Sequence, residues 1–318
     1  MRAQEPTPTA FDATAVEVLA DEDTQIALWA LYELSYRGFD DVDADREWSP
    51  ALLTTRAQVD TAFERAIRDL TDPVVDEVIG EPDGAGAQLV ALIEGDDGPS
   101  LAQHLQRRAT EEQYREFLVH RSVYHLKESD PHAFGIPRLD GAPKVALAEL
   151  QYDEFGGGRP DRLHSSLFAR ALEGAGLDAT YGAYVDVVPG PTLAVNNAMS
   201  LFALHRRLRG ALMGHLAAFE STSSLPCKRY SGGAERLGFG SRVTAYFDEH
   251  VEADAVHEQL AVRTICQGLV DQEPELHRDV LMGAAACLKL DALAGQQMLD
   301  AWDQGGSALV AVDHEEVA

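Results

Sequence analysis

The most informative stretch of this sequence is YFDEHVEADAVHE, residues 246–258. On a helix, His250, Asp254 and His257 occupy positions i, i+4 and i+7. At about 100° per residue, these three side chains fall within roughly 60° of one another, on one helix face. Two imidazoles and a carboxylate on one face form a ligand set suited to iron, manganese or zinc. An ordinary polar face is the alternative, although the other acidic residues of the stretch already supply a solvent face.

One helix cannot surround a metal ion, so this stretch predicts a bundle in which other helices add ligands. Glu220 ends a long apolar helix, and Glu154 and His164 flank a run of three glycines and a proline, residues 156–160. Glycine and proline interrupt helices and can re-aim both side chains. Plainer interpretations stay open: Glu220 at an exposed helix end, the glycines as a simple loop, and Asp161 as a rival ligand to His164.

The rest of the sequence is typical of helices, because it is rich in Ala, Leu, Glu and Arg and its β-branched runs are short. We expect an all-α fold with a helical extension at 1–100 packed on a core of 101–305, and a tail at 306–318. The segment 80–99 is expected to be a loop around a short apolar piece. Helices are predicted at residues 24–36, 54–70, 110–129, 141–155, 161–173, 192–221, 242–269 and 274–302.

The composition excludes several classes of protein. Of 318 residues, 26 are Lys or Arg and 53 are Asp or Glu, so the net charge of −27 repels nucleic acid and anionic lipid. Three scattered cysteines are too few for a disulfide framework or a zinc site. Without a signal-peptide pattern or a long apolar run, we expect a cytoplasmic protein with no membrane segment. Glycine-rich nucleotide motifs and the Gly-x-Ser-x-Gly motif are also absent from the sequence.

A family resemblance rests on six residues in order: Glu154-x9-His164, then Glu220, then His250-x3-Asp254-x2-His257. This pattern resembles the ligand signature of the haem-oxygenase-like diiron oxidases, the iron-containing redox enzymes. The phrases QYDEFGGGRP, FESTSSLP and DEHVEAD are also similar to that family, and the resemblance extends from about residue 110 to residue 300. It implies a seven-helix, haem-oxygenase-like fold without haem. It also implies that the six residues bind two iron ions, Fe(II) or Fe(III), and act in catalysis.

The ligand spacing is most similar to that of the N-oxygenating members, which can recruit a further carboxylate from an earlier helix. Glu128 is placed for that role, and a surface position beside Lys127 is the alternative. The resemblance implies an O2-dependent monooxygenase or oxidase of natural product biosynthesis. It would perform N-oxygenation of an amine or amino acid, with O2 as cosubstrate and an external reductant. Oxidative C–C cleavage or decarboxylation of an amino or fatty acid, a metal-free helical scaffold and a single-metal hydrolase are alternatives. A homodimer and a separate electron donor stay open.

Overall fold

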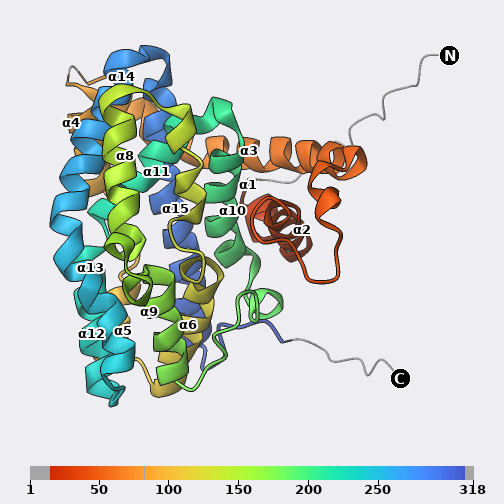
Figure 1. Ribbon diagram of the computed structural model, residues 1–318. Coiled ribbons are helices and arrows are strands. Elements are labelled where there is room, and N and C mark those ends of the chain that lie inside the picture. Colours follow the sequence, from red (N-terminus) through yellow and green to blue (C-terminus); the bar gives the residue numbers. More distant parts are fainter. Residues whose placement is uncertain (1–14, 82, 312–318) are drawn as a thin grey trace.

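The computed structural model describes residues 15–81 and 83–311, apart from the side chains of residues 252–256. Within that part the chain forms helices and no strand, which confirms the predicted all-α class (Figure 1). The first helices are α1 (Ala15–Ala20), α2 (Glu22–Glu33), α3 (Pro50–Ile79), α4 (Ala85–Glu94), α5 (Leu101–Arg107), α6 (Glu111–His125), α7 (Asp130–Ala133) and α8 (Gly141–Glu154). The remaining ones are α9 (His164–Gly174), α10 (Gly190–Leu204), α11 (Arg209–Ser221), α12 (Ser224–Leu237), α13 (Ser241–Gln259), α14 (Gly268–Gln272) and α15 (His277–Asp303). A π-helical segment, Leu260–Gln267, joins α13 to α14.

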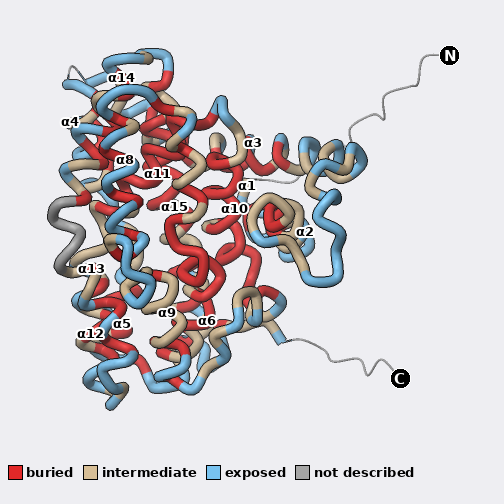
Figure 2. Tube along the Cα trace, viewed as in Figure 1, coloured by how far each residue is buried: buried red, intermediate tan, exposed pale blue. Residues whose placement is uncertain are grey.

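The centre of the bundle is the crossing of α11 and α15, two helices whose residues are largely buried (Figure 2). Two glycines let the backbones approach closely at this crossing. A Cβ atom on Gly214 would lie 1.8 Å from the Val280 carbonyl oxygen, and one on Gly283 would lie 1.9 Å from that of Ala211. The absence of these two side chains therefore sets the distance between the helices.

The N-terminal helices share this core. Helix α3 packs on α15, and α2 packs on α10 at one side of the bundle (Figure 1). Phe63 of α3 is fully buried in the same hydrophobic cluster as Phe202 of α10. At the other end, the Val310 amide donates to the Val187 carbonyl, while residues 312–318 of the predicted tail lie outside the described residues. The expected boundary at residue 100 and the division of the core into seven helices stay predictions.

The prediction of a single long helix at 192–221 is wrong, because the helix is interrupted between α10 and α11. His205 is extended, with φ −96° and ψ 107°, and a 3-10 turn, Arg206–Leu208, follows. The Arg138 guanidinium donates hydrogen bonds to the last carbonyl oxygens of α10, those of Ala203 and Leu204. His205 Nε2 lies 2.8 Å from an Asp60 carboxylate oxygen on α3. Contacts from distant parts of the chain therefore satisfy the polar groups that the break exposes.

Several other predicted helices have different ends, and two of them lie beside the candidate ligands. The helix expected at 110–129 ends at His125, and a turn follows in which Ser129 adopts a left-handed φ of 70°. The helix expected from residue 161 begins only at His164: Gly156, Gly157 and Gly158 all have positive φ and interrupt the helix, and a 3-10 turn, Pro160–Arg162, precedes α9. The break predicted at the three glycines is thus confirmed.

Helices α12 and α4 were not among the helices predicted from the sequence. The glycines and Pro226 of α12 give it a weak helical signal, but a Cβ on Gly233 would lie 2.6 Å from the Leu105 carbonyl oxygen of α5. That glycine is therefore needed for close packing. The apolar piece inside the expected loop at 80–99 forms α4.

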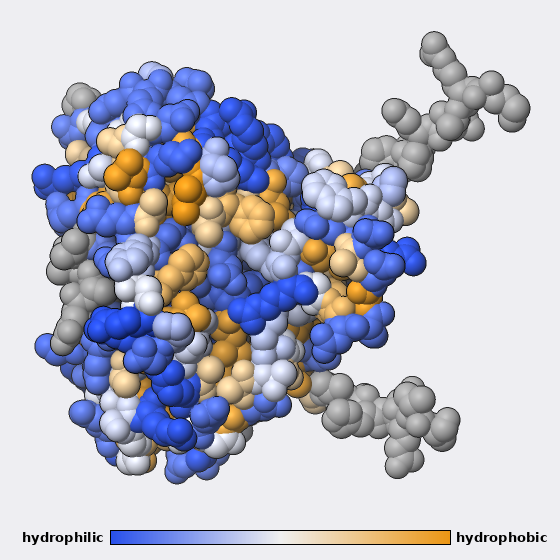
Figure 3. All heavy atoms as spheres, in the orientation of Figure 1, coloured by the Kyte–Doolittle hydropathy of each residue, from blue (hydrophilic) through white to orange (hydrophobic). Residues whose placement is uncertain are grey.

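The face of the molecule seen in Figure 3 is mostly hydrophilic, with small hydrophobic patches between polar ones. This distribution matches a chain whose acidic residues are largely solvated. None of the described helices combines the length and the apolar character needed to cross a membrane.

Candidate metal centre

Six of the seven predicted ligand residues meet inside the bundle. They come from the turn after α6, the end of α8, the start of α9, the end of α11 and one face of α13. The side chains are buried in every case: Glu128, Glu154, His164, Glu220, His250 and His257. The positive-φ glycines place the end of α8 and the start of α9 side by side, which brings Glu154 and His164 together.

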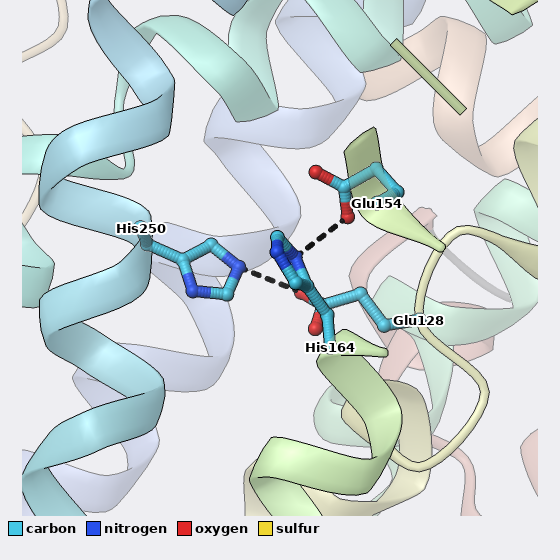
Figure 4. A group of neighbouring side chains, drawn as sticks. All are labelled: Glu128, Glu154, His164 and His250. Carbon is cyan, nitrogen blue, oxygen red and sulfur yellow. Dashed lines mark ion pairs between the residues drawn. The ribbon is translucent and has the colours of Figure 1, made fainter. Parts of the chain in front are cut away.

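The first group contains Glu128, Glu154, His164 and His250 (Figure 4). Each residue offers one ligand atom, and these four atoms lie within 4.8 Å of one another. The His164 Nδ1 atom is 3.0 Å from Glu154 Oε2, and the His250 Nε2 atom is 3.5 Å from Glu128 Oε1. Both imidazoles and both carboxylates therefore point at one common volume.

The second group contains Glu154, Glu220 and His257, whose ligand atoms also lie within 4.8 Å of one another. The His257 Nδ1 atom is 3.3 Å from Glu220 Oε2 and 3.6 Å from Glu154 Oε1. Glu154 thus belongs to both groups, with Oε2 toward His164 and Oε1 toward His257. A carboxylate in this position can bridge two ions.

The donor atoms fit a cation. His250 Nδ1 lies 2.8 Å from the Tyr246 carbonyl oxygen, which it meets as a donor, so its Nε2 lone pair faces the first group. The buried His250 Nε2 and His164 Nδ1 atoms make no aligned hydrogen bond. Buried polar atoms without a partner are rare, and a cation would satisfy both. Mixed nitrogen and oxygen donors suit iron.

The electrostatics of the metal-free protein also favour a positive charge here. Burial opposes the charged imidazolium, but the negative charge of the nearby Glu128 carboxylate outweighs it and raises the pKa of His250 to about 10. For His257, burial is likewise outweighed, by Glu220, and the pKa rises to about 9. Against the burial effect, His125 and His250 hold the pKa of Glu128 well below its usual range. In the absence of metal, protons on the imidazoles balance the buried carboxylates.

The structure brings six of the seven predicted residues together, and two of the alternatives that the sequence left open are wrong. Glu128 is not a surface residue and Glu220 is not at an exposed helix end, because both side chains are buried. Asp161, the rival to His164, is exposed. Asp254 lies on α13 between His250 and His257, but its side chain is outside the described residues.

Sequence reasoning missed the residues that support the ligands. The Tyr246 hydroxyl lies 2.8 Å from both carboxylate oxygens of Glu128 and 2.8 Å from His125 Nδ1. His125 in turn lies 3.1 Å from Glu128. The available signal was spacing, because Tyr246 precedes His250 by one helical turn and His125 precedes Glu128 by three residues.

A cavity of about 260 Å³ reaches the first group from the rim of the bundle. Glu128 and His250 lie at its inner end, and Asp96 and Asp291 lie at its outer end. Its walls include several aromatic rings from α6, α11, α12 and α13: Phe117, Phe219, Tyr230, Tyr246 and Phe247. A small molecule can therefore enter a largely apolar chamber that ends at two of the candidate ligands.

Comparison with known proteins identifies a family that the chain matches. Residues 115–292 match the family model described as an iron-containing redox enzyme. Nitrosourea synthase from Streptomyces achromogenes subsp. streptozoticus is 29% identical over 172 residues, which are 52% of this chain and 36% of that enzyme. The matched segment thus spans about a third of the length of that curated relative.

Two solved structures of a CADD-like protein of unknown function from Nostoc punctiforme PCC 73102 are also similar. They have TM-scores of 0.48 at 16% and 14% identity, and cover 74% and 78% of this chain and 97% and 99% of that one. The family match, which extends over more than half of the chain, confirms the resemblance drawn from the ligand pattern. The chain belongs to the haem-oxygenase-like family of iron-containing redox enzymes.

Proposed function

We propose that the chain is a non-haem diiron oxygenase that activates O2 to oxidise a small metabolite, by N-oxygenation of an amine or amino acid. The position of Glu154 carries this proposal. Its two carboxylate oxygens face two separate buried ligand groups, as a ligand shared by two ions must. A protein built for one ion needs only one of these groups.

One ion would lie among Glu128, Glu154, His164 and His250, and the other among Glu154, Glu220 and His257. Asp254 follows His250 by one helical turn, and we propose it as a further ligand. Two ferrous ions bound here would supply electrons for the reduction of O2, and an external reductant, delivered by a donor protein or a small molecule, would restore them.

The surrounding residues prepare the site for this chemistry. Tyr246 holds the carboxylate of Glu128 through its hydroxyl and the ring of His250 through its carbonyl. Such supporting contacts fix the orientation of the ligands. The aromatic walls of the cavity exclude water from the substrate while it lies beside Glu128.

The relative in Streptomyces supports nitrogen chemistry over C–C cleavage. Its name states that it makes a nitrosourea, a compound defined by an oxidised nitrogen. The similarity covers only 36% of that enzyme, so we extend to this chain the oxidation of a nitrogen and not the formation of a nitrosourea.

Iron stoichiometry in matched variants tests the proposal. The protein and three variants are loaded with ferrous iron under argon, and the bound iron per chain is measured after desalting. We expect two ions in the wild type and in Glu149→Ala, an exposed position on the same helix as Glu154. We expect about one ion in His257→Ala and less than one in Glu154→Ala, because only Glu154 serves both groups.

Oxygen consumption by the iron-loaded wild type is then screened against amines, amino acids and fatty acids, with ascorbate as reductant. An oxidised nitrogen in the product, identified by mass spectrometry, supports N-oxygenation, and loss of CO2 or an alkene product supports the cleavage alternative. Wild-type iron below one per chain, or activity that persists with zinc under argon, would overturn the diiron proposal.

A further inference from the structure

Glu128 of the first ligand group lies on a turn and not on a helix. It follows the end of α6 at His125 and reaches toward His250 (Figure 4). The next residue, Ser129, has φ 70° and ψ −15°. Among the described residues, it alone combines a positive φ with a side chain larger than that of glycine. Such a conformation costs free energy and persists only where the surrounding structure imposes it. We call residues 126–130 the ligand turn.

The bundle holds the inner side of the ligand turn. The Ser129 amide donates to the Tyr124 hydroxyl oxygen at 3.2 Å, and the Gln151 side-chain amide donates to Ser129 Oγ at 2.6 Å. The Tyr246 hydroxyl holds the Glu128 carboxylate. These contacts fix Ser129 and the side chain of Glu128, and the residues just before Glu128 are held from another part of the chain.

That part is the segment at the end of α2, residues 33–37. Arg37 Nη2 donates to the Leu126 carbonyl oxygen at 3.0 Å. Lys127 Nζ lies 3.4 Å from Glu33 Oε2. These contacts join residues that are 89 and 94 positions apart in the chain. The N-terminal helices therefore bind both the backbone and a side chain of the ligand turn.

The ion pair in this contact is rigid. The side chains of Lys127 and Glu33 are only 2% and 1% exposed. Charges removed from water need each other and further hydrogen bonds. The Glu33 carboxylate has these bonds, because it also accepts from the Tyr181 hydroxyl at 2.5 Å and from the Arg37 amide at 3.2 Å. The Lys127 ammonium lies 4.3 Å from the centre of the Tyr36 ring, a favourable cation–π contact. The pair therefore fixes Lys127, and with it the backbone next to Glu128.

A purely structural ion pair is the alternative explanation, but it would stabilise the fold equally well at another place. Here the contacts enclose one ligand residue. Leu126 and Lys127 directly precede Glu128, and Arg37 Nη2 also lies 3.8 Å from Asp130 Oδ2, two residues after it. The same short segment contains the left-handed Ser129. Strained residues of this kind are concentrated at functional sites.

We propose that Glu33 and Arg37 are positioning residues, which hold the ligand turn in its left-handed conformation and thereby present Glu128 to the first ion. The inference rests on the proposed function, since that function makes Glu128 an iron ligand. It gives the N-terminal helices a role at the metal centre. A carboxylate that no regular helix holds is kept in place by α2, and neither positioning residue touches the ion.

The affinity of the first ligand group for iron tests the proposal. The His257→Ala protein, in which we expect only this group to be filled, is compared with the same protein carrying Glu33→Gln or Arg37→Gln. Fe2+ affinity is measured under argon by competition with a chelator, at a temperature at which circular dichroism shows each variant to be folded. We expect each added substitution to weaken the affinity about tenfold or more, because loss of a residue that supports a metal ligand costs about 10–100-fold.

Asp60→Asn in the same background is the matched control. Asp60 is also a buried carboxylate of the N-terminal helices, but it contacts Tyr32 and His205. We expect this substitution to leave the iron affinity unchanged. If Glu33→Gln fails to fold, Arg37→Gln decides the question, because the Arg37 side chain is 48% exposed.

Amide hydrogen exchange tests the contact without iron. The metal-free full-length protein is compared with Glu33→Gln and Arg37→Gln, and exchange is measured by mass spectrometry in peptides that cover residues 126–134. We expect exchange in these peptides to be about tenfold or more faster in both variants, because a lost charged hydrogen bond lowers the free energy of local opening by about that factor. Peptides from α15 serve as the internal reference and should exchange as in the wild type.

The outcomes separate positioning from structural support. Unchanged iron affinity in the folded variants, or an equal loss of affinity in Asp60→Asn, would overturn the positioning role even if stability falls. Unchanged exchange at residues 126–134, or exchange that rises equally in α15, would overturn the local contact. If the wild-type protein binds no iron, the proposed function fails, and the exchange experiment still decides whether α2 holds the ligand turn.

Discussion

Replacing Gly283 with alanine tests whether the α11–α15 crossing holds the bundle together. A Cβ atom at this position would lie 1.9 Å from the Ala211 carbonyl oxygen, a backbone atom that no side-chain rotation can move away. Contacts between heavy atoms are favourable only beyond about 3.5 Å. The two helices would therefore have to separate by about 1.5 Å at the centre of the core.

The expected loss of stability follows from two opposing effects. Alanine in a helix interior is favoured over glycine by about 1 kcal/mol. Overpacking of a tight core costs about 1–3 kcal/mol and sometimes more, and an overlap with backbone belongs at the upper end of that range. We expect the free energy of unfolding of Gly283→Ala to fall by about 2 kcal/mol, measured as a lower urea concentration at half-unfolding of the metal-free protein.

The matched control lies on the same helix. At Gly295, a Cβ atom would make only an ordinary contact, 3.8 Å from the Leu101 Cβ atom. We expect Gly295→Ala to be neutral or to stabilise the protein by up to about 1 kcal/mol. Equal stability of Gly283→Ala and the wild type, or an equal loss in both variants, would refute the reasoning.

Three further predictions concern the site and its support. Tyr246→Phe removes the hydroxyl group that holds the Glu128 carboxylate. We expect it to weaken iron binding about 10–100-fold, measured by competition with a chelator, while the fold is retained. Unchanged iron affinity would contradict the positioning role of Tyr246. Because the pKa of His250 is raised to about 10 from 6.5, its contribution to the stability of the metal-free protein should be complete below about pH 6.5 and be lost as pH rises toward 10. Urea midpoints at pH 6 and 9.5 measure this, and a slope unchanged in His250→Gln would argue against it. Glu33→Gln removes the carboxylate that pairs with the buried Lys127 ammonium group. We expect the free energy of unfolding, measured by thermal denaturation, to fall by about 3–5 kcal/mol. A loss below about 1 kcal/mol would show that the ion pair is dispensable.

The sequence predicted those parts of the fold that depend on local order. Helical spacing placed His250 and His257 on one face of α13, and three glycines marked the turn that joins Glu154 to His164. The family resemblance then joined these local patterns into one set. Residues that share a helix or flank a tight turn are constrained by the chain itself, so their proximity can be read without tertiary contacts.

The parts that the sequence did not reveal depend on residues far apart in the chain. The break after α10 is stabilised by Arg138 and by Asp60 of α3, and the helix at 224–237 needs Gly233 because Leu105 packs there. The same holds for Arg121, which forms an ion pair with Asp291, 170 positions later in the sequence. Helical periodicity contains no information about such pairs.

The acidic composition has two physical meanings in this protein. Most carboxylates are solvated and add to solubility, but Glu128, Glu154 and Glu220 are buried close together, where their charges would repel unless a cation balances them. Without metal, protons on His250 and His257 supply that balance, as their raised pKa values show. Metal must displace these protons to bind, so raising the pH weakens the metal-free fold and favours the metal-bound one. The energy that iron contributes to stability should therefore grow with pH, a coupling that a lone structural ion pair at this position would not produce.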